Sequence, residues 1–316
     1  MELRALGRTG LSISPIVFGG NVFGWTADEK TSFDLLDRFF DAGFNTIDTA
    51  DVYSKWVPGH VGGESETVIG KWLKRGGVSR DKAIIVTKFG HPSMGENNKL
   101  KAHWVAEAVE LSLKRLQTDY IDLYLSHFPD DSTPHEETLG ALAKLKDAGK
   151  VRSIGCSNFS AEQLKASLDA AKAGGLPRYD VLQPEYNLYT RDTFEGPIAD
   201  LCMAEDIGVI SYYALAAGFL TGKYRKPEDA EGKARGYRIP DYINDKGLKI
   251  LSAMDTVAAE TGASLASIAI AWVAARPGIT APIASATSIN QLEAMIAAGN
   301  LKLTDAQMAL LNEAGA

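Results

Sequence analysis

Short runs of aliphatic and β-branched residues recur along the chain, and longer amphipathic stretches separate them. Each run has the length and composition of a buried strand. The eight runs are 16–18, 45–48, 83–88, 121–126, 151–156, 181–183, 208–212 and 280–283. Nearly continuous apolar strands that alternate with helices are typical of a parallel sheet covered by helices. Eight such units close into a barrel more readily than they form an open sheet, so we predict an α/β fold, a (β/α)8 TIM barrel.

Three of the amphipathic stretches open with a capping box, in which Ser or Thr is followed three residues later by Glu or Gln. These patterns begin at Thr133, Ser160 and Ser288. They predict helices that start there, because the side chains satisfy backbone amides that the first helical turn leaves unpaired.

Two further segments lie outside this repeating pattern. The first 15 residues contain two alternating runs on either side of Arg8-Thr9-Gly10, which predict an N-terminal β-hairpin that plugs the bottom of the barrel. One long polar connection runs from Lys223 to Lys246, and a connection of this length in a compact domain is typically a lid or disordered. Because no linker or low-complexity segment divides the chain, we expect a single domain, 1–316.

Composition argues against several classes of function. The net charge of −7 disfavours broad binding to nucleic acid or to anionic membranes, since both require a basic surface. Cys156 and Cys202 are too few for a disulfide framework, and we find neither a signal-peptide pattern nor an apolar run of about 18 residues. We therefore expect a soluble, cytoplasmic protein. No metal site is expected either, because metal-ligand spacing is absent among His60, His91, His103 and His135.

Polar side chains occupy the ends of successive predicted strands, where a barrel of this kind places its chemistry. Asp48 ends the second run and Tyr53 follows it, Lys88 ends the third, and His127 follows the fourth. An acid, a phenol, an ammonium and an imidazole would therefore converge on one mouth of the barrel. A neighbouring ammonium lowers the pKa of a phenol by favouring the phenolate, and Asp48 would hold Lys88 charged and aimed.

Each of these residues also has a simpler interpretation by itself. Asp48 could cap a turn, and His127 could be an ordinary loop or core histidine. Lys88 could be the Schiff-base lysine of a barrel aldolase, whose amine must be deprotonated before it attacks, although Asp48 opposes this by stabilising the charged form. Cys156 is most simply a small buried side chain. The convergence of all four polar residues favours an acid–base centre.

Aromatic residues lie on the same predicted loops as the four polar residues. They could pack in the core, lie at the surface or line an apolar substrate pocket. With Tyr53 and His127, the expected pocket residues are Trp25, Trp56, Phe89 and Phe128, and Phe23 belongs to the same group of aromatic side chains.

The segments that carry these residues resemble the aldo-keto reductase superfamily. They are FNTIDTADVY (44–53), VTKFG (86–90) and LSHFPD (125–130), followed by IGCSNFS (154–160), LQPEYNLY (182–189), ISYYALAAGFLTGKY (210–224) and IASATSINQLEA (283–294). The resemblance implies an oxidoreductase that reduces aldehydes or ketones to alcohols with NADPH, or alternatively NADH. In this family the cofactor lies extended across the barrel mouth, which agrees with the lack of G-x-G-x-x-G and Walker A patterns in the chain.

Residue by residue, the resemblance assigns roles to the matching positions. Tyr53 would be the general acid, Lys88 and Asp48 would tune it, and His127 would orient the substrate carbonyl. Tyr212 would stack on the nicotinamide ring. Other cofactor contacts are implied for Ser157, Asn158 and Gln183 at the carboxamide, for Ala214, Leu215, Ala216 and Gly218 at the pyrophosphate, and for Gly20, Asn21, Val22 and Asp48 beside the cofactor.

The expected 2′-phosphate site departs from the family pattern. Many relatives carry Lys or Arg in the segment equivalent to 285–288, but this chain has neither between residues 277 and 301. The phosphate would instead meet hydroxyls and amides near Ser285, Thr287 and Gln291, together with Lys223 and Arg235 of the cofactor lid loop. We therefore expect a modest preference for NADPH.

Potassium-channel β subunits share this barrel and much of its cofactor site, so a cofactor-binding regulatory subunit is the alternative function. Those subunits have Asn at the position of His127, and the histidine here favours an enzyme. The expected partner is a small carbonyl or alcohol substrate that is apolar or sugar-like.

Overall fold

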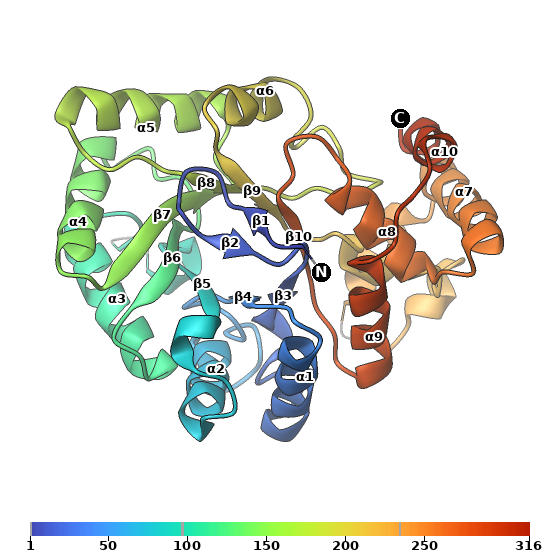
Figure 1. The fold of residues 1–316 in the computed structure, drawn as a ribbon, viewed down its shortest axis with the longest axis horizontal. Helices are drawn as coiled ribbons and strands as arrows, with labels where there is room; N and C mark the ends of the chain where they lie inside the picture. The colour runs from blue at the N-terminus through green and yellow to red at the C-terminus, as the bar shows by residue number, and fades with distance from the viewer. Residues whose placement is uncertain (1, 96–97, 234) are drawn as a thin grey trace.

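The computed structural model describes residues 2–95, 98–233 and 235–316, and within them eight parallel strands form a closed barrel (Figure 1). The strands are β3 (Val17–Gly19), β4 (Thr46–Asp48), β5 (Ile84–Phe89), β6 (Ile121–Ser126), β7 (Val151–Ser157), β8 (Val181–Gln183), β9 (Gly208–Ser211) and β10 (Ala281–Ala284). Neighbouring strands pair in sequence order, and β10 closes the barrel on β3. The predicted TIM barrel is confirmed, and each predicted strand overlaps an observed one.

Helices surround the barrel, and their buried apolar residues belong to one hydrophobic cluster (Figure 1). They are α1 (Glu29–Asp41), α2 (Glu64–Arg75), α3 (Ala102–Leu116), α4 (His135–Asp147), α5 (Ala161–Gly174), α6 (Pro197–Ala204), α7 (Asp245–Thr261), α8 (Leu265–Ala274), α9 (Ile289–Ala298) and α10 (Asp305–Ala314). Among the described residues, no single helix is long and apolar enough to cross a membrane. Only α7 and α8, joined at a 98° bend, meet that length and composition criterion as a pair.

The three predicted capping boxes have different outcomes. Ser160 caps α5 as predicted, since its hydroxyl accepts from the Gln163 amide and the Gln163 side chain accepts from the Ser160 amide. At α9 the Ser288 hydroxyl accepts from the Gln291 amide, but the Gln291 side chain pairs with Thr287 instead. The capping box predicted at Thr133 is wrong. The Thr133 hydroxyl donates to Asp130 Oδ2 at 2.6 Å, and α4 starts at His135 without a side-chain cap.

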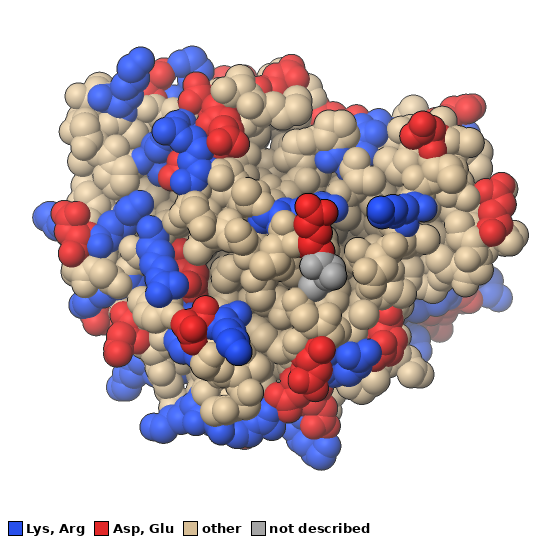
Figure 2. Space-filling view, in the orientation of Figure 1, with Lys and Arg blue, Asp and Glu red and all other residues tan. Residues whose placement is uncertain are grey.

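The predicted N-terminal hairpin is present as β1 (Arg4–Ala5) paired antiparallel with β2 (Ser12–Ile13). It lies across the barrel in the view of Figure 1. Leu6 and Ile13 are fully buried in the apolar cluster that fills the barrel interior. The hairpin therefore plugs the end of the barrel where the strands begin. On this face, Lys and Arg are interspersed with Asp and Glu around the rim, and the centre carries few charges (Figure 2).

The long connection 223–246 folds into short 3-10 turns before α7 begins. These turns are η5 (Pro227–Ala230), η6 (Gly236–Arg238) and η7 (Pro240–Tyr242), and they follow η4 (Ala216–Thr221). Ala230, Ile239 and Tyr242 are buried in the main hydrophobic cluster and anchor the connection to the rest of the fold. The described residues of this lid thus have a defined conformation despite their polar composition.

Candidate active site

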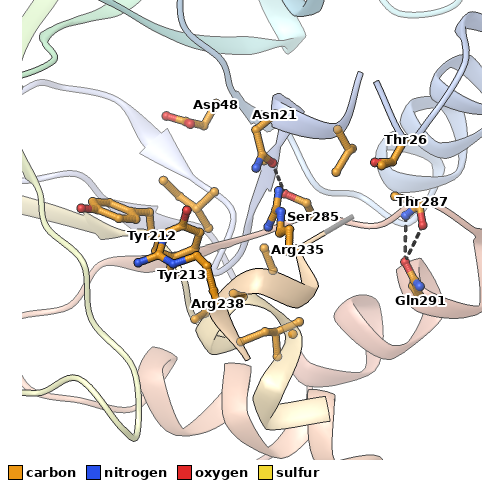
Figure 3. A pocket seen from close by; sticks show the side chains of 18 of the residues that line it. Asn21, Thr26, Asp48, Tyr212, Tyr213, Arg235, Arg238, Ser285, Thr287 and Gln291 are labelled. Carbon is orange, nitrogen blue, oxygen red and sulfur yellow. Dashed lines mark hydrogen bonds between the residues drawn. The ribbon is translucent and has the colours of Figure 1, made fainter. Parts of the chain in front are cut away.

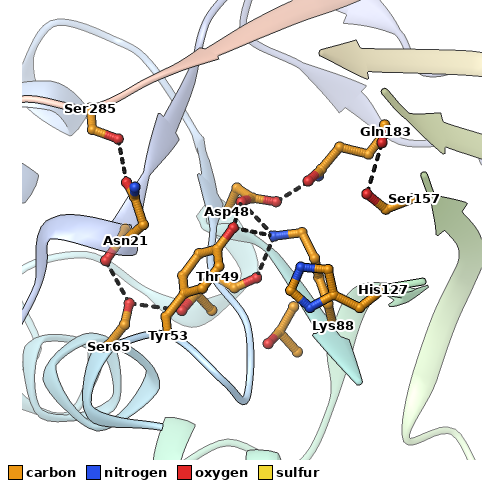
Figure 4. Close-up of polar contacts among 12 residues, drawn as sticks. Asn21, Asp48, Thr49, Tyr53, Ser65, Lys88, His127, Ser157, Gln183 and Ser285 are labelled. Atoms are coloured by element: carbon orange, nitrogen blue, oxygen red, sulfur yellow. Dashed lines mark hydrogen bonds and ion pairs between the residues drawn. The ribbon is translucent and has the colours of Figure 1, made fainter. Parts of the chain in front are cut away.

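The four polar residues predicted from the strand ends meet at the carboxyl end of the barrel (Figure 4). Asp48 ends β4 and Lys88 lies near the end of β5, so adjacent parallel strands bring their side chains together. The Lys88 Nζ donates to Asp48 Oδ1 at 2.7 Å, to the Thr49 carbonyl at 2.8 Å and to the Tyr53 hydroxyl at 2.8 Å. Three acceptors match the three N–H bonds of an ammonium, which fixes the position of the charge.

Lys88 is fully buried and is not among the residues that line the pocket described below. Burial lowers the pKa of Lys88 and the Asp48 carboxylate opposes that shift. A Schiff-base lysine must present a free lone pair to its substrate. Because all three donor directions of Lys88 are taken by protein acceptors, the geometry does not support the aldolase interpretation.

Tyr53 is half-buried, and its hydroxyl donates to Asp48 Oδ1 at 3.2 Å while it accepts from Lys88. Burial, followed by the Asp48 carboxylate, raises the pKa of Tyr53 well above its ordinary value. The expected net lowering of this pKa by Lys88 is therefore wrong for this structure, because desolvation and the Asp48 carboxylate, which both disfavour the phenolate, outweigh the ammonium. At neutral pH the phenol holds its proton, which is the form that a general acid requires.

His127 follows β6 with its side chain buried beside Tyr53, and the two ring centroids are 6.2 Å apart. Burial, Lys88 and His91 lower the pKa of His127 well below its ordinary value, so its ring is neutral at pH 7. Its Nδ1 is buried without a partner among the described residues. We assign the proton to Nε2, because this tautomer avoids burying an N–H without an acceptor.

A cavity of about 910 Å³ opens beside these residues and extends along the barrel mouth to the start of α9 (Figure 3). Tyr53 and His127 line one end, and Thr287 and Gln291 line the other. This volume is at the upper end of the range for cofactor and small-molecule sites. The predicted residues that line it are Asn21, Val22, Trp25, Asp48, Trp56, Phe128, Ser157, Asn158, Gln183, Tyr212, Ala214, Leu215, Gly218, Lys223, Arg235 and Ser285.

Ser157, Asn158 and Gln183 form one hydrogen-bonded unit that joins the pocket to Asp48 and His127. Gln183 Nε2 donates to Asp48 Oδ2 at 2.7 Å, and the Ser157 hydroxyl donates to the Gln183 carbonyl at 2.8 Å. Asn158 donates to the His127 carbonyl and accepts from the Tyr212 hydroxyl at 2.6 Å. Asn158 therefore positions Tyr212 and the His127 loop, and the Gln183 Oε1 is the acceptor that remains for a ligand amide.

The loop after β9 has an unusual backbone. Tyr213, Ala216, Ala217 and Gly218 have φ values of 59°, 46°, 57° and 98°, in the left-handed region. For the non-glycine residues this conformation costs about 1 kcal/mol each, and such strain clusters at ligand sites. Successive amides in turns of this kind form concave anion sites. Two predicted amides are already used, however, because Ala216 donates to Tyr213 and Gly218 donates to Leu215.

The far end of the cavity combines hydroxyl, amide and basic groups. The Ser285 hydroxyl donates to Asn21 Oδ1 at 2.6 Å, and Gln291 Oε1 accepts from both the amide and the hydroxyl of Thr287 (Figure 3). The Arg235 guanidinium lies 5.5 Å from the Trp25 ring centroid. The lid also contributes Lys233 and Arg238, which the sequence reasoning missed although both lie in the basic lid segment.

Besides Lys88, three predicted site residues lie behind the cavity wall. Phe89 is fully buried and stacks on Tyr124 with ring centroids 4.7 Å apart. Side chains alternate along a strand, so the inward direction of Lys88 sends Phe89 outward to the helices. Gly20 and Ala216 are buried and do not line the cavity, and Phe23, in the same aromatic group, packs on Phe18 in the core.

Several pocket residues were not foreseen, among them His91, Glu185 and Tyr213. His91 and Glu185 follow strand ends, and Tyr213 follows Tyr212 directly. Their positions on the loops at the strand ends were the sequence signal that could have identified them as pocket residues. Asp51, inside the FNTIDTADVY segment, was also missed. Its carboxyl is buried without a hydrogen-bond partner among the described residues, and burial, with a smaller effect from Glu66, raises its pKa to about 8.

Metal chemistry and thiol chemistry have little structural basis in the described residues. His, Cys, Asp and Glu form no group of three or more there that could hold a metal ion. Cys156 and Cys202 are buried free thiols, and burial raises the pKa of Cys156 well above its ordinary value.

Comparison with known proteins places this geometry in context. The model of the Aldo/keto reductase family matches residues 15–316. The chain is 36% identical to "Aldo-keto reductase YhdN" of Bacillus subtilis, over 93% of this chain and 88% of that protein. It is 35% identical to "Uncharacterized oxidoreductase YrpG" of the same organism, over 99% and 95%. It is also 34% identical to a "Probable voltage-gated potassium channel subunit beta" of Oryza sativa subsp. japonica, over 92% and 89%.

Proposed function

Because the chain belongs to the aldo/keto reductase family, we propose that it reduces aldehydes or ketones to alcohols with NADPH, in the cytoplasm. The observation that carries this proposal is the position of Tyr53. Its hydroxyl, protonated at neutral pH, faces the cavity with Lys88 Nζ 2.8 Å behind it. Two buried free thiols agree with a reducing compartment.

The cavity has the groups that a nicotinamide dinucleotide requires. Gln183 Oε1 offers an acceptor for the carboxamide, Tyr212 offers a ring face, and the left-handed loop around Ala217 offers backbone amides for the pyrophosphate. Lys223 and Arg235 supply positive charge toward the Thr287 end. When bound, NADPH would supply the hydride that adds to the substrate carbonyl carbon.

The protein's part in this reaction is to hold the carbonyl oxygen and to give it a proton. The Tyr53 hydroxyl turns from Asp48 Oδ1 to the substrate oxygen, while Lys88 keeps donating to the phenol oxygen and stabilises the phenolate that forms. The neutral His127 donates from Nε2 to the same substrate oxygen as negative charge develops on it. Trp25, Trp56 and Phe128 surround this end of the cavity with apolar surface and limit the access of water.

NADPH is preferred over NADH in this proposal because the lid carries the charge that the α9 segment lacks. We expect Arg235 to read the 2′-phosphate, supported by Gln291 Nε2 and the Thr287 region. A hydrogen bond to a charged group contributes about 1.5–3 kcal/mol, so Arg235→Ala should weaken NADPH binding about 10- to 100-fold and NADH binding far less. Arg225→Ala is the matched control, since Arg225 lies on the same lid, pairs with Asp255 of α7 and does not line the cavity. Equal losses for both cofactors would remove this role from Arg235.

The test of the whole proposal is a panel of aldehydes and ketones assayed with both reduced cofactors, read by the loss of nicotinamide absorbance. We expect steady turnover with NADPH. Absence of turnover with every carbonyl, combined with tight cofactor binding, would instead support the second candidate function, a cofactor-binding regulatory subunit. That candidate rests on the similarity to the plant protein named as a channel subunit beta.

A further inference from the structure

His91 is a pocket residue whose orientation is fixed by the turn that follows β5. It is the N-cap of η3 (Pro92–Met94), and its Nδ1 accepts from the Ser93 backbone amide at 3.1 Å. The Ser93 hydroxyl lies 2.9 Å from the same nitrogen. The Ser93 carbonyl is in turn hydrogen-bonded by Lys55, which ties the turn to the loop after β4.

The hydrogen bonds of His91 determine its tautomer. A nitrogen that accepts from a backbone N–H cannot also carry a proton, so the neutral ring carries its proton on Nε2. Burial, with a smaller effect from Lys55, lowers the pKa of His91, so the ring is neutral at pH 7. Nε2 is therefore a hydrogen-bond donor, and it makes no hydrogen bond to any described residue.

The surroundings of His91 place it in the substrate half of the cavity. Its ring centroid is 5.1 Å from that of His127 and 5.1 Å from that of Phe128, with edge-to-face geometry in both cases. The neighbouring walls are aromatic, since Trp25 and Trp56 pack edge to face at 5.5 Å and Phe128 stacks on His127 at 5.2 Å. Polar donors in this half are few: apart from Tyr53, His91 is a donor next to His127.

We propose that His91 selects substrates that carry an oxygen on the carbon next to the reacting carbonyl, as in 2-hydroxy aldehydes and 2-oxo aldehydes. This inference rests on the proposed function, in which Tyr53 and His127 both bind the reacting oxygen. A second oxygen on the adjacent carbon then lies beside the neighbouring imidazole, which donates to it from Nε2. A substrate with a methyl group at that place leaves the donor unpaired in an aromatic pocket, and such mismatches reduce kcat/KM.

The experiment compares 2-hydroxypropanal with 2-methylpropanal, which differ only by a hydroxyl in place of a methyl group. The ratio of their kcat/KM values with NADPH measures recognition of the second oxygen. We expect the wild-type ratio to favour the hydroxy aldehyde by about tenfold, the size of a neutral hydrogen bond in an apolar site.

The informative variant is His91→Asn. Asparagine is a strong N-cap residue, so its side-chain oxygen keeps the bond from the Ser93 amide while the Nε2 donor disappears. We expect the ratio to fall to about one, with NADPH affinity measured in parallel to verify a folded site. His103→Asn is the matched control, because His103 is an exposed residue of α3 outside the cavity, and it should keep the wild-type ratio.

The possible outcomes separate this inference from the proposed function. A wild-type ratio near one, or a ratio that His91→Asn leaves unchanged, would overturn the role of His91. Reduction of both aldehydes in the same experiment would still support the proposed function. Absence of reduction of both aldehydes and of the wider carbonyl panel would overturn the proposed function and the inference with it.

Discussion

A buried carboxylate lies at each end of the barrel, and each is stabilised by positively charged side chains and hydrogen-bond donors. The two clusters differ in how completely their polar groups are paired. At the bottom, Asp122 of β6 accepts from Arg80 at 2.7 Å, from Arg152 at 2.9 Å and from the Ile85 amide at 3.0 Å. Both guanidiniums also lie over the Tyr120 ring, at 3.9 and 3.8 Å from its centroid. At the top, Asp48 of β4 accepts from Lys88, Tyr53 and Gln183.

The difference lies in what each cluster leaves unpaired. Arg80 directs three further donors to Thr118, Ala83 and Tyr120, and Arg152 is half-exposed, so the bottom cluster leaves no buried polar atom without a partner among the described residues. The top cluster has a hydroxyl that faces a cavity, an imidazole whose Nδ1 has no partner among the described residues, and a nearby buried carboxyl, Asp51, in the same condition. Perturbed pKa values also gather at the top, at Asp51, Tyr53, Lys88 and His127. A saturated cluster stabilises a fold, whereas an unsaturated one is available for chemistry.

The largest expected effect is that of Lys88→Met on turnover. The substitution removes the donor proposed to stabilise the Tyr53 phenolate and leaves Asp48 without its counter-ion. General acid catalysis contributes about 10²- to 10⁴-fold, and we expect kcat for carbonyl reduction to fall within that range. Arg80→Met is the matched change at the bottom cluster. If it lowered kcat of the folded protein as much as Lys88→Met does, the functional distinction between the two clusters would fail.

Asp122→Ala should have the opposite profile, a loss of stability without a loss of catalysis. Removing one partner of a buried ion pair costs about 3–5 kcal/mol, and we expect about 3 here because Arg152 is half-exposed and can reach water. The free energy of unfolding from urea titration measures the loss. We also expect Asp122→Ala and wild type to have the same kcat per folded molecule. A lower kcat in the variant would show that this cluster contributes to turnover.

Asp51, near the top cluster, should make the free energy of unfolding depend on pH. Its pKa, raised by burial to about 8 in the folded protein, is about 3.9 in an unfolded chain. The folded state thus holds a proton that the unfolded state releases, so this group lowers stability as pH rises from about 4 to about 8, with no further change above that.

Asp51→Asn replaces the protonated acid by a neutral side chain of the same shape and removes this penalty. Relative to wild type, the variant should gain at least about 2 kcal/mol between pH 5 and pH 9. Thermal unfolding at the two pH values measures the gain. A stability difference that is the same at both would show that Asp51 is ionised in the folded protein despite its burial.

The smallest effect concerns Tyr212. Tyr212→Ala removes the ring proposed to lie against the nicotinamide and should weaken cofactor binding by about 1 kcal/mol. Tyr212→Phe keeps the ring and loses only the hydrogen bond to Asn158, so its cofactor affinity should stay closer to wild type. Fluorescence titration with NADPH compares the two. If Phe and Ala weakened binding equally, the hydroxyl rather than the ring would be responsible.

The sequence was sufficient to predict what depends on local pattern. Eight apolar runs predict the barrel, and polar residues at strand ends predict that Asp48, Tyr53, Lys88 and His127 converge, because parallel strands share one carboxyl edge. The strict alternation of strand side chains should also have excluded Phe89 from the pocket once Lys88 was assigned inward.

What could not be predicted depends on tertiary packing. The raised pKa of Tyr53 follows from its burial and from the Asp48 carboxylate beside its hydroxyl, which no spacing reveals. Asp51 lies in the quoted motif, but its isolation follows from the packing of α2 and α3, where Glu66 and Arg115 pair with each other at 2.6 Å. His91 becomes a donor only through the turn at Ser93.

The most direct test of the account is the turnover of Tyr53→Phe, with NADPH affinity measured on the same preparation. The substitution removes one oxygen atom, which the account assigns to proton transfer and to no cofactor contact. We predict a loss in kcat of about 10²-fold or more with the dissociation constant of NADPH nearly unchanged. A loss below about tenfold would contradict the assignment of Tyr53 as the general acid.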